Sequence, residues 1–332
     1  MVKIKYSTKY FPRTAVIELT NMCNLRCNHC YVDKSESNLL DIETCINLID
    51  QLSKLGCFKL VISGGEVFLH KEILFEFVKK AKKMQFDITI ITNMTLCKYD
   101  DILLLKSLGL NSLNVSLYGK DEQTYLYFTG SKQDVTELKK KVLFAKNIGI
   151  KVTVLSVGIN SLYLDLLDIQ KWCSENDIPL NIAYVIYGKE KGIQQEEPLS
   201  NDKMNGLLIG DKRVFSLHKG TETRSVLDFC AAGAHNICIA ANGNVYPCTN
   251  WRVKVGSIFN NTLIDIWNNS AELEQIRQMR FVDFECSKCD KFDLCPVCPG
   301  INYSSTGNAH KPSPELCRYT SIVHQCALTE SE

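Results

Sequence analysis

Three cysteines near the start of the chain have a spacing that suits metal chemistry. Cys23, Cys27 and Cys30 lie within eight residues, so their thiolates can reach one small inorganic cluster. A four-iron cluster has four iron corners, and three cysteines leave one iron free to bind a cofactor or a substrate. The alternative for this segment is a structural zinc site in which His29 is the fourth ligand.

The elements around these cysteines favour the cluster. Helical patterns at 42–55, 71–84 and 134–147 alternate with stretches rich in β-branched residues, and Asp41 and Gly56 are placed to cap the first helix. Six strand–helix units are too few for a closed eight-fold barrel, so we predict an α/β fold with a partial, open (β/α)6 TIM-like barrel. The cysteines follow the first strand, at the end of the barrel where active sites lie. The six predicted strands are 15–19, 59–62, 87–91, 112–117, 151–155 and 181–186.

A glycine pair and a carboxylate follow the second predicted strand. Gly64 and Gly65 let the backbone approach a ligand closely, and the Glu66 carboxylate can pair with an ammonium group. The three-cysteine spacing, the aromatic residue after it and this motif together resemble the signature of the radical S-adenosylmethionine (SAM) superfamily. The resemblance implies that the cysteines hold a [4Fe–4S] cluster whose open iron binds SAM. It also implies reductive cleavage of SAM to a 5′-deoxyadenosyl radical, which takes a hydrogen atom from the substrate.

The same resemblance implies further contacts with SAM. Gly64-Gly65-Glu66 would meet the methionine amino group, and Tyr31 would lie near the adenine. Asn93 and Ser116 end the third and fourth strands, where relatives contact the ribose or the carboxylate. Many relatives carry Ser-Ile-Asp-Gly at the fourth strand, whereas this chain has Ser116-Leu117-Tyr118-Gly119, so the contact there stays open.

Eight more cysteines crowd into the last third of the chain. Such density in a cytosolic chain of this length indicates metal or redox chemistry rather than disulfides. Asn242-Gly243 predicts a hairpin that brings Cys230 close to Cys248. Two zinc ribbons could also use eight cysteines. The five remaining cysteines are predicted to be packing residues without a ligand role: Cys45, Cys57, Cys97, Cys173 and Cys326.

The spacing of seven of these cysteines, all but Cys238, resembles the SPASM extension of radical SAM enzymes, with one residue fewer before Cys298. The resemblance implies two auxiliary [4Fe–4S] clusters beside the radical SAM cluster, three in all. Cys238 is the candidate for a fourth near ligand, and an open iron is the competing arrangement. The implied ligands are Cys286, Cys289, Cys295 and Cys317 for the far cluster, and Cys230, Cys248 and Cys298 for the near one.

The chain divides into three predicted parts: a barrel over 1–200, a linker over 201–228 and the cysteine-rich domain over 229–332. The net charge of +1 creates no global field that favours nucleic acid. No apolar run is long enough for a signal peptide or a membrane span. We therefore expect a cytoplasmic protein with no nucleic-acid or membrane partner.

The resemblance implies a radical SAM oxidoreductase that modifies a ribosomally made peptide or protein. SPASM-containing relatives form thioether or carbon–carbon crosslinks, or oxidise Cys or Ser to formylglycine. Crosslinking is favoured here, with an auxiliary cluster accepting the electron left on the substrate. The implied partners are the peptide, an electron donor such as flavodoxin or ferredoxin, and a separate recognition protein that could deliver the peptide. The alternatives are a sulfatase-type formylglycine maturase, a radical oxidase of a small molecule or tetrapyrrole, and a non-catalytic metal-binding protein.

Overall fold

The computed structural model describes residues 10–30, 32, 36–186, 196–208 and 230–329. Within them, nine strands form one sheet in the order β6-β5-β4-β3-β2-β1-β7-β8-β9. All neighbours from β6 to β7 are parallel, whereas the pairs β7–β8 and β8–β9 are antiparallel. The strands are β1 (Thr14–Glu18), β2 (Lys59–Ser63), β3 (Asp87–Thr92), β4 (Ser112–Ser116), β5 (Lys151–Val157), β6 (Leu180–Ala183), β7 (Asn236–Ile239), β8 (Asn244–Tyr246) and β9 (Gly256–Ser257).

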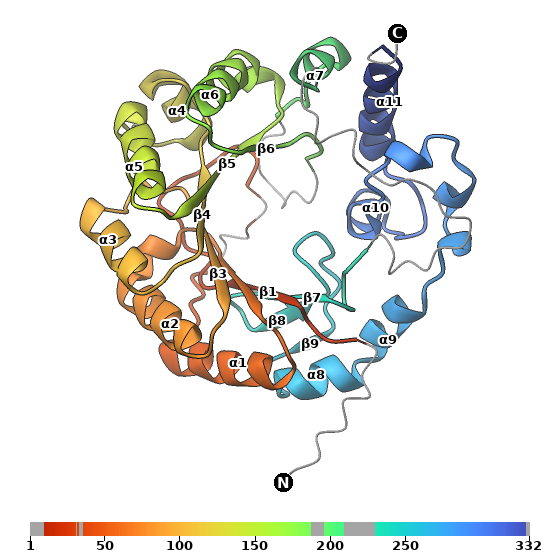
Figure 1. Cartoon of the computed structure of the whole chain (residues 1–332). Helices are drawn as coiled ribbons and strands as arrows, with labels where there is room; N and C mark the ends of the chain where they lie inside the picture. The colour runs from red at the N-terminus through yellow and green to blue at the C-terminus, as the bar shows by residue number, and fades with distance from the viewer. Residues whose placement is uncertain (1–9, 31, 33–35, 187–195, 209–229, 330–332) are drawn as a thin grey trace.

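The α-helices form the outer layer around this curved sheet (Figure 1). Short 3₁₀ turns precede α2 and α6, and three more lie around the late cysteines, at Phe281–Asp283, Glu285–Lys288 and Phe292–Leu294. The α-helices are α1 (Ile42–Lys54), α2 (Lys71–Lys83), α3 (Tyr99–Ser107), α4 (Glu122–Thr129), α5 (Val135–Asn147), α6 (Tyr163–Glu175), α7 (Asn201–Leu208), α8 (Leu263–Asn269), α9 (Ala271–Gln278), α10 (Pro299–Thr306) and α11 (Pro314–Thr329).

The predicted partial barrel of six parallel strands is confirmed. Asp41 caps α1 by accepting the Thr44 N–H at 2.8 Å, and Gly56 follows the helix with a φ of +82°. The sixth strand is shorter than predicted, because the chain leaves the sheet after Ala183 and the next residues turn toward the barrel interior.

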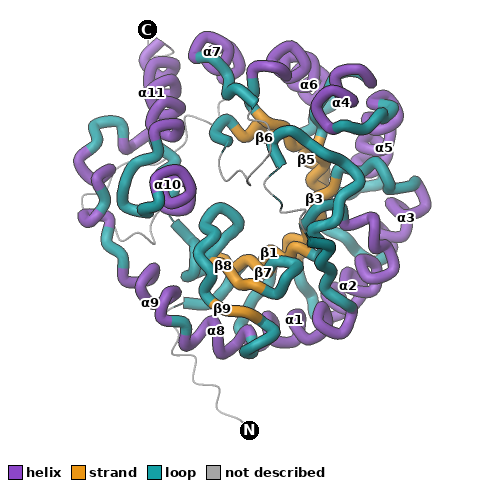
Figure 2. Tube along the Cα trace, turned by 180° about the vertical axis from the view of Figure 1, so that it is seen from behind, coloured by secondary structure: helices purple, strands orange, loops and turns teal. Residues whose placement is uncertain are grey.

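The cysteine-rich part extends the barrel and then wraps around it. β7 pairs in parallel with β1, so the sheet continues from the first strand into this part. Ile264 at the start of α8 donates its N–H to the Gln51 side chain of α1, and Arg318 of α11 donates to the Leu199 carbonyl beside α7. Figures 1 and 2 show the resulting ring, with α10 and α11 opposite α3 and α5.

The predicted linker begins with ordered structure, since its first eight residues form α7 (Asn201–Leu208). Residues 209–228 lie outside the described part of the chain. The domain boundaries at 200 and 229 therefore stay predictions. None of the helices in the described residues is long and apolar enough to cross a bilayer.

Alternation along the strands separates the core from the barrel interior. Ile17 and Ile62 are fully buried beneath the helices, while Val16 and Val61, one residue earlier, line an internal cavity. The parallel register keeps these inward positions aligned from strand to strand. The inward-facing side chains of the strands thus form an apolar wall around the internal cavity.

Candidate active site

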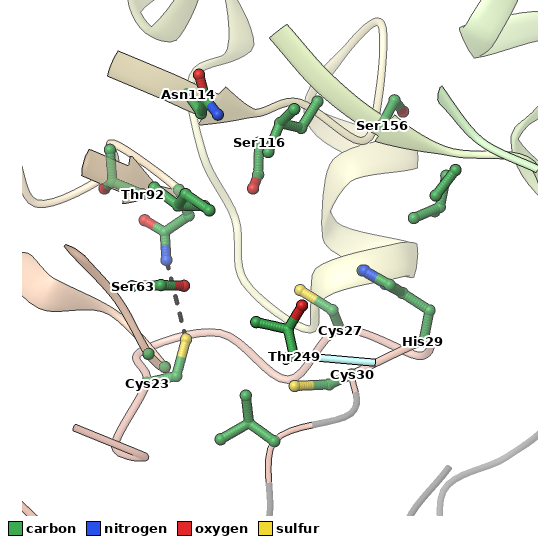
Figure 3. Close-up of a pocket in the computed structure, with 18 of the residues that line it drawn as sticks. Cys23, Cys27, His29, Cys30, Ser63, Thr92, Asn114, Ser116, Ser156 and Thr249 are labelled. Atoms are coloured by element: carbon green, nitrogen blue, oxygen red, sulfur yellow. Dashed lines mark hydrogen bonds between the residues drawn. The ribbon is translucent and has the colours of Figure 1, made fainter. Parts of the chain in front are cut away.

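A cavity of about 600 Å³ lies at the C-terminal ends of the parallel strands. Ser63, Thr92 and Ser116, which end β2, β3 and β4, line it, as does Ala183 at the end of β6. Figure 3 shows several of these side chains around one space. Polar strand ends therefore surround an otherwise largely apolar chamber.

The predicted cysteine triad lies at this cavity. Cys23, Cys27 and Cys30 follow β1 on a single loop, and all three line the space (Figure 3). Among the described residues, no three His, Cys, Asp or Glu side chains converge tightly enough to hold a single metal ion. Cysteines that bind separate iron corners stand farther apart than the ligands of one ion. Three thiols around one open space fit the ligand set of a cluster with one open iron.

Helix α4 supports the cysteine loop from outside the cavity. The Arg26 N–H donates to the Thr129 carbonyl at 2.7 Å, and the Asn28 N–H donates to the Phe128 carbonyl at 3.1 Å. His29, the predicted alternative zinc ligand, stacks on the Phe128 ring with centroids 5.2 Å apart. The end of α4 thus fixes the middle of the loop.

The glycine pair touches the same loop from the other side. Gly65 donates its N–H to the Thr20 carbonyl at 2.6 Å, and a Cβ on Gly65 would lie 2.1 Å from the Met22 carbonyl oxygen. Gly64 has a φ of +143°, and a Cβ there would lie 2.3 Å from the Thr20 oxygen. Both glycines also line the cavity. Glycine is needed here because two backbones meet directly beside the space that a cofactor would occupy.

Glu66 turns away from the cavity, although the sequence predicted that its carboxylate meets an ammonium group. The carboxylate is buried and accepts hydrogen bonds from the Thr92 hydroxyl at 2.7 Å, the Asn93 N–H at 2.8 Å and the Phe68 N–H at 3.1 Å. Burial raises the pKa of this carboxyl, and the three donors oppose that rise. Its contacts tie the end of β3 to the glycine loop, and a direct contact with a cofactor stays a prediction.

The two other predicted strand-end contacts have different surroundings. Ser116 lines the cavity close to Tyr118, whose buried phenol also lies near Cys27. Burial raises the pKa of Tyr118 well above its usual value. Asn93 lines the cavity too, but its side-chain amide is engaged with the chain itself. Tyr31 lies outside the described residues.

The predicted near-cluster cysteines come together in the C-terminal part. Burial raises the pKa of the Cys230 thiol to about 12, and the neighbouring Cys248 and Cys298 thiolates contribute to that rise. Burial likewise raises the pKa of Cys248 to about 11. The predicted Asn242-Gly243 hairpin is confirmed as the β7–β8 turn. The mutual effect of these three thiols shows that they lie close together, as the ligands of one cluster would.

Cys238 has other neighbours. It lies on β7 opposite Val16, fully buried, and the Arg252 guanidinium donates toward its sulfur over 3.9 Å. Arg252 also forms an ion pair with Glu18 at the end of β1. Burial raises the pKa of Cys238 well above its usual value, and Cys248 is close enough to add to the rise. These contacts fit both a ligand role and a packing role, so the role of Cys238 stays open.

The predicted far-cluster cysteines form a second group. Burial raises the pKa of Cys295 to about 11, with the charges of Cys286, Cys317 and Cys289 contributing. The Thr320 hydroxyl donates to the Cys295 sulfur at 3.2 Å. Cys289 and Cys317 are exposed, so this group lies at the surface.

The five cysteines that the sequence assigns no ligand role are buried and contribute no side chain to the cavity. Cys45 of α1 is typical: burial raises the pKa of its thiol to about 12. They are Cys45, Cys57, Cys97, Cys173 and Cys326.

Several cavity residues were missed in the sequence. Polar side chains within otherwise apolar strands were a usable signal, because inward positions of a barrel reach the cavity. Among the described residues that line the cavity, Arg252 is the only Lys or Arg, and none of them is Asp or Glu. The missed residues are Asn114, Ser156 and Asn181 on β4–β6, and Thr249, Asn250, Arg252 and Ser304 from the C-terminal part.

Two family models match the two parts of the chain. Residues 17–173 match the radical SAM superfamily, and residues 230–299 match the SPASM iron–sulfur cluster-binding domain. The chain carries a radical SAM domain followed by a SPASM domain. This radical SAM protein therefore binds SAM and iron–sulfur clusters, and the donor chemistry of its three cysteine groups fits them.

Similar proteins include enzymes of two kinds. GTP 3′,8-cyclase of Aquifex aeolicus is 27% identical over 70% of this chain and 80% of its own length. The sporulation killing factor maturation protein SkfB of Bacillus subtilis is 25% identical over 81% of this chain and 67% of its own. The subtilosin biosynthesis protein AlbA of the same species is 33% identical, over 43% of this chain and 32% of its own.

Solved structures share the fold over most of the chain. Streptococcus suis SuiB bound to the precursor peptide SuiA aligns with a TM-score of 0.72 and 19% identity, over 93% of this chain and 76% of SuiB. anSMEcpe with bound AdoMet and a peptide aligns with a TM-score of 0.71 and 16% identity, over 96% of this chain and 98% of that one. At these identities the likeness concerns the fold.

Proposed function

We propose that this radical SAM enzyme oxidatively crosslinks a ribosomally made peptide, through a thioether or a carbon–carbon bond. The observation that carries the proposal is a single cavity with the triad on one side and the C-terminal part on the other. Thr249 and Asn250, which follow the near-cluster residue Cys248, line this cavity together with Cys23 and Cys30. A substrate held there would lie beside both the radical source and an electron acceptor.

Three [4Fe–4S] clusters are part of the proposal. Cys23, Cys27 and Cys30 would hold the radical SAM cluster, which when loaded supplies the electron that cleaves SAM to methionine and a 5′-deoxyadenosyl radical. Gly64 and Gly65 leave room for the methionine part beside that loop. The auxiliary ligands are those assigned above from the two cysteine groups, with Cys238 as the candidate fourth ligand of the near one.

The count of atoms and electrons in a crosslinking reaction explains why an auxiliary cluster is needed. Joining a thiol sulfur or a carbon to a second carbon removes two hydrogen atoms from the peptide. One leaves as a hydrogen atom and becomes part of 5′-deoxyadenosine. The other leaves as a proton and an electron, and an auxiliary cluster held by the C-terminal cysteines would take up that electron and pass it to an external acceptor.

The relatives support a peptide substrate. AlbA and SkfB are named for the biosynthesis and maturation of peptide products, and SuiB is seen with a precursor peptide. Most of the C-terminal cysteines lie in the region that matches the SPASM domain, and a cluster held by them would be the electron acceptor that such a reaction needs. A flavodoxin or ferredoxin as electron donor, and a separate recognition protein for the peptide, belong to the same proposal.

The similarity to GTP 3′,8-cyclases points to a second candidate, a small-molecule substrate. A nucleoside triphosphate carries several negative charges, which proteins usually neutralise with several cationic groups. Arg252 is the only Lys or Arg that the described residues contribute to the cavity lining, and it is already paired with Glu18. The described cavity therefore fits a peptide better than GTP.

The test is anaerobic co-expression with the small open reading frames that flank the gene, followed by mass spectrometry of the peptides. We expect one peptide to lose about 2 Da for each crosslink, the mass of two hydrogen atoms. Fragmentation should be suppressed between the linked residues. Oxidation of Ser to formylglycine would give the same mass loss, but its product would react with a hydrazide probe.

Two variants control this experiment. Cys27→Ala should leave the peptide unmodified, whereas Cys173→Ala, in the buried face of α6, should retain modification. Unmodified peptides together with a converted GTP or tetrapyrrole pool would reject the peptide proposal in favour of the small-molecule reading.

A further inference from the structure

The Asn93 side chain reaches the Cys23 sulfur along the wall of the cavity. Its Nδ2 lies 3.9 Å from the Cys23 Sγ and 3.0 Å from the Asn24 Oδ1 (the dashed line in Figure 3 ends on the Cys23 sulfur). Asn93 is buried at the end of β3, and Cys23 lies on the loop after β1. The contact therefore joins two segments 70 residues apart in the sequence.

The orientation of this amide is set by its other end. The Asn93 Oδ1 accepts hydrogen bonds from the Thr95 N–H at 3.0 Å and the Thr95 hydroxyl at 2.7 Å. A backbone N–H can only donate, so the atom that faces it must be the amide oxygen. The amide nitrogen, with its two hydrogens, is therefore the end that faces Cys23 and Asn24.

Asn24 and Thr95 complete a closed network, which we call the Asn93 brace. The Asn24 Nδ2 donates to the Thr95 Oγ1 at 2.8 Å, so each of the three residues is bonded to the other two. The Asn93 backbone N–H in turn donates to the buried Glu66 carboxylate. Asn93 is buried and its two partners are half-buried, and a closed network of this kind has little freedom to rotate.

These hydrogen bonds change the role that we assign to Asn93. The sequence predicted a contact with the ribose or carboxylate of SAM, but the amide oxygen already accepts two bonds and the nitrogen is directed at Asn24 and Cys23. Hydrogen bonds to the cysteine sulfurs of an iron–sulfur cluster stabilise the reduced, more negative state and raise the reduction potential.

We propose that Asn93 is a positioning residue that orients the Cys23 thiolate and raises the reduction potential of the cluster held by the triad. The inference rests on the proposed role of Cys23, Cys27 and Cys30 as ligands. It explains why Gly64-Gly65-Glu66 ends in a carboxylate, because Glu66 anchors the backbone of the residue that contacts Cys23.

The test is a redox titration of the triad cluster in the full-length, reconstituted enzyme, followed by EPR without SAM. Asn93→Leu keeps the approximate size of the side chain but removes the donor. The Cys27→Ala variant, which keeps all the auxiliary cysteines, provides the background signal for subtraction. Asn114→Leu, the same substitution on β4 in the same cavity, is the matched control.

We expect the midpoint potential of Asn93→Leu to be more negative than that of both the wild type and Asn114→Leu. An unchanged potential in Asn93→Leu, whatever happens to SAM affinity, would overturn the proposal and return Asn93 to a cofactor contact. If Asn93→Leu does not fold, Asn93→Ser takes its place in the titration, because the serine hydroxyl is too short to reach the sulfur. The same shift to a more negative midpoint potential is then expected.

The titration also separates this inference from the assignment of the triad. If wild type and Cys27→Ala hold the same amount of iron and give the same signals, the triad holds no cluster and the assignment itself fails. If the two differ but Asn93→Leu matches the wild type, only the role of Asn93 fails.

Discussion

A backbone contact decides where the cysteine loop lies. The Gly65 N–H and the Glu66 N–H donate to the Thr20 and Met22 carbonyls, immediately before Cys23. No side chain fits between these segments, because a Cβ on Gly65 would lie within 2.1 Å of the Met22 oxygen. The glycines thus position the triad as well as leaving space for a cofactor.

Gly65→Ala should therefore damage the cluster site more than it damages the fold. We expect a loss of about 1–3 kcal/mol in unfolding free energy from the forced backbone shift, together with loss of the triad's iron. Gly56→Ala is the matched control, since Gly56 has a φ of +82° but its Cβ would meet nothing nearer than 3.7 Å. Denaturant unfolding and iron analysis measure the two effects. Equal iron retention in both variants would contradict this account.

At the scale of the element, α4 is the support of the cysteine loop. Its last two residues, Phe128 and Thr129, accept the backbone N–H groups of Asn28 and Arg26. Its first turn depends on Asp121, whose carboxylate accepts the Thr124 N–H at 2.9 Å. This hydrogen bond lowers the pKa of Asp121 in the folded protein. The Asp121 cap therefore stabilises the first turn of α4, and α4 in turn holds the backbone of the cysteine loop in place.

Asp121→Ala should cost about 1 kcal/mol at neutral pH and speed the loss of iron to a chelator. Because folding lowers this pKa, the stabilisation is complete above the unfolded value of about 3.9 and is lost as the pH falls through the lower folded value. The gap between variant and wild type should then close in acid. Asp134→Ala removes the corresponding cap of α5 and should cost similar stability without faster iron loss. Equal rates of iron loss in the two variants would argue against α4 as the support.

The elements were more predictable than the directions of their side chains. Strand and helix positions follow from periodic burial, and the parallel order follows from the strand–helix alternation. The sequence also located Cys23, Glu66 and Asn93 at strand ends, but it did not show that Glu66 and Asn93 bond to the chain. That depends on packing between segments far apart in sequence, such as Asn93 against Asn24. Arg252 was missed for the same reason, because its partner Glu18 lies 234 residues away.

On the scale of the whole molecule, the C-terminal part closes the barrel into a ring. β7 extends the sheet at β1, and Arg318 of α11 reaches Leu199 and Asn201 beside the other edge. Thr249 and Asn250, which follow the near-cluster residue Cys248, line the cavity, while Cys289 and Cys317 lie at the surface. This order suits electron transfer from the cavity outward.

The iron content follows from this arrangement. Three four-iron clusters predict about twelve irons per chain after anaerobic reconstitution. Cys317→Ala should lower that number by about four, since it removes one ligand of the far group, and should leave SAM cleavage intact while slowing peptide modification. Iron and zinc analysis measures the first effect. Stoichiometric zinc with little iron would contradict the cluster assignments altogether.

The central claim is that the loop of Cys23, Cys27 and Cys30 generates a radical from SAM. The most direct measurement is 5′-deoxyadenosine formation by the reconstituted enzyme with SAM and a strong reductant, compared between wild type and Cys27→Ala. The account predicts 5′-deoxyadenosine from the wild type and none above background from Cys27→Ala. Equal formation by the two proteins, or none by an iron-loaded wild type, would contradict it.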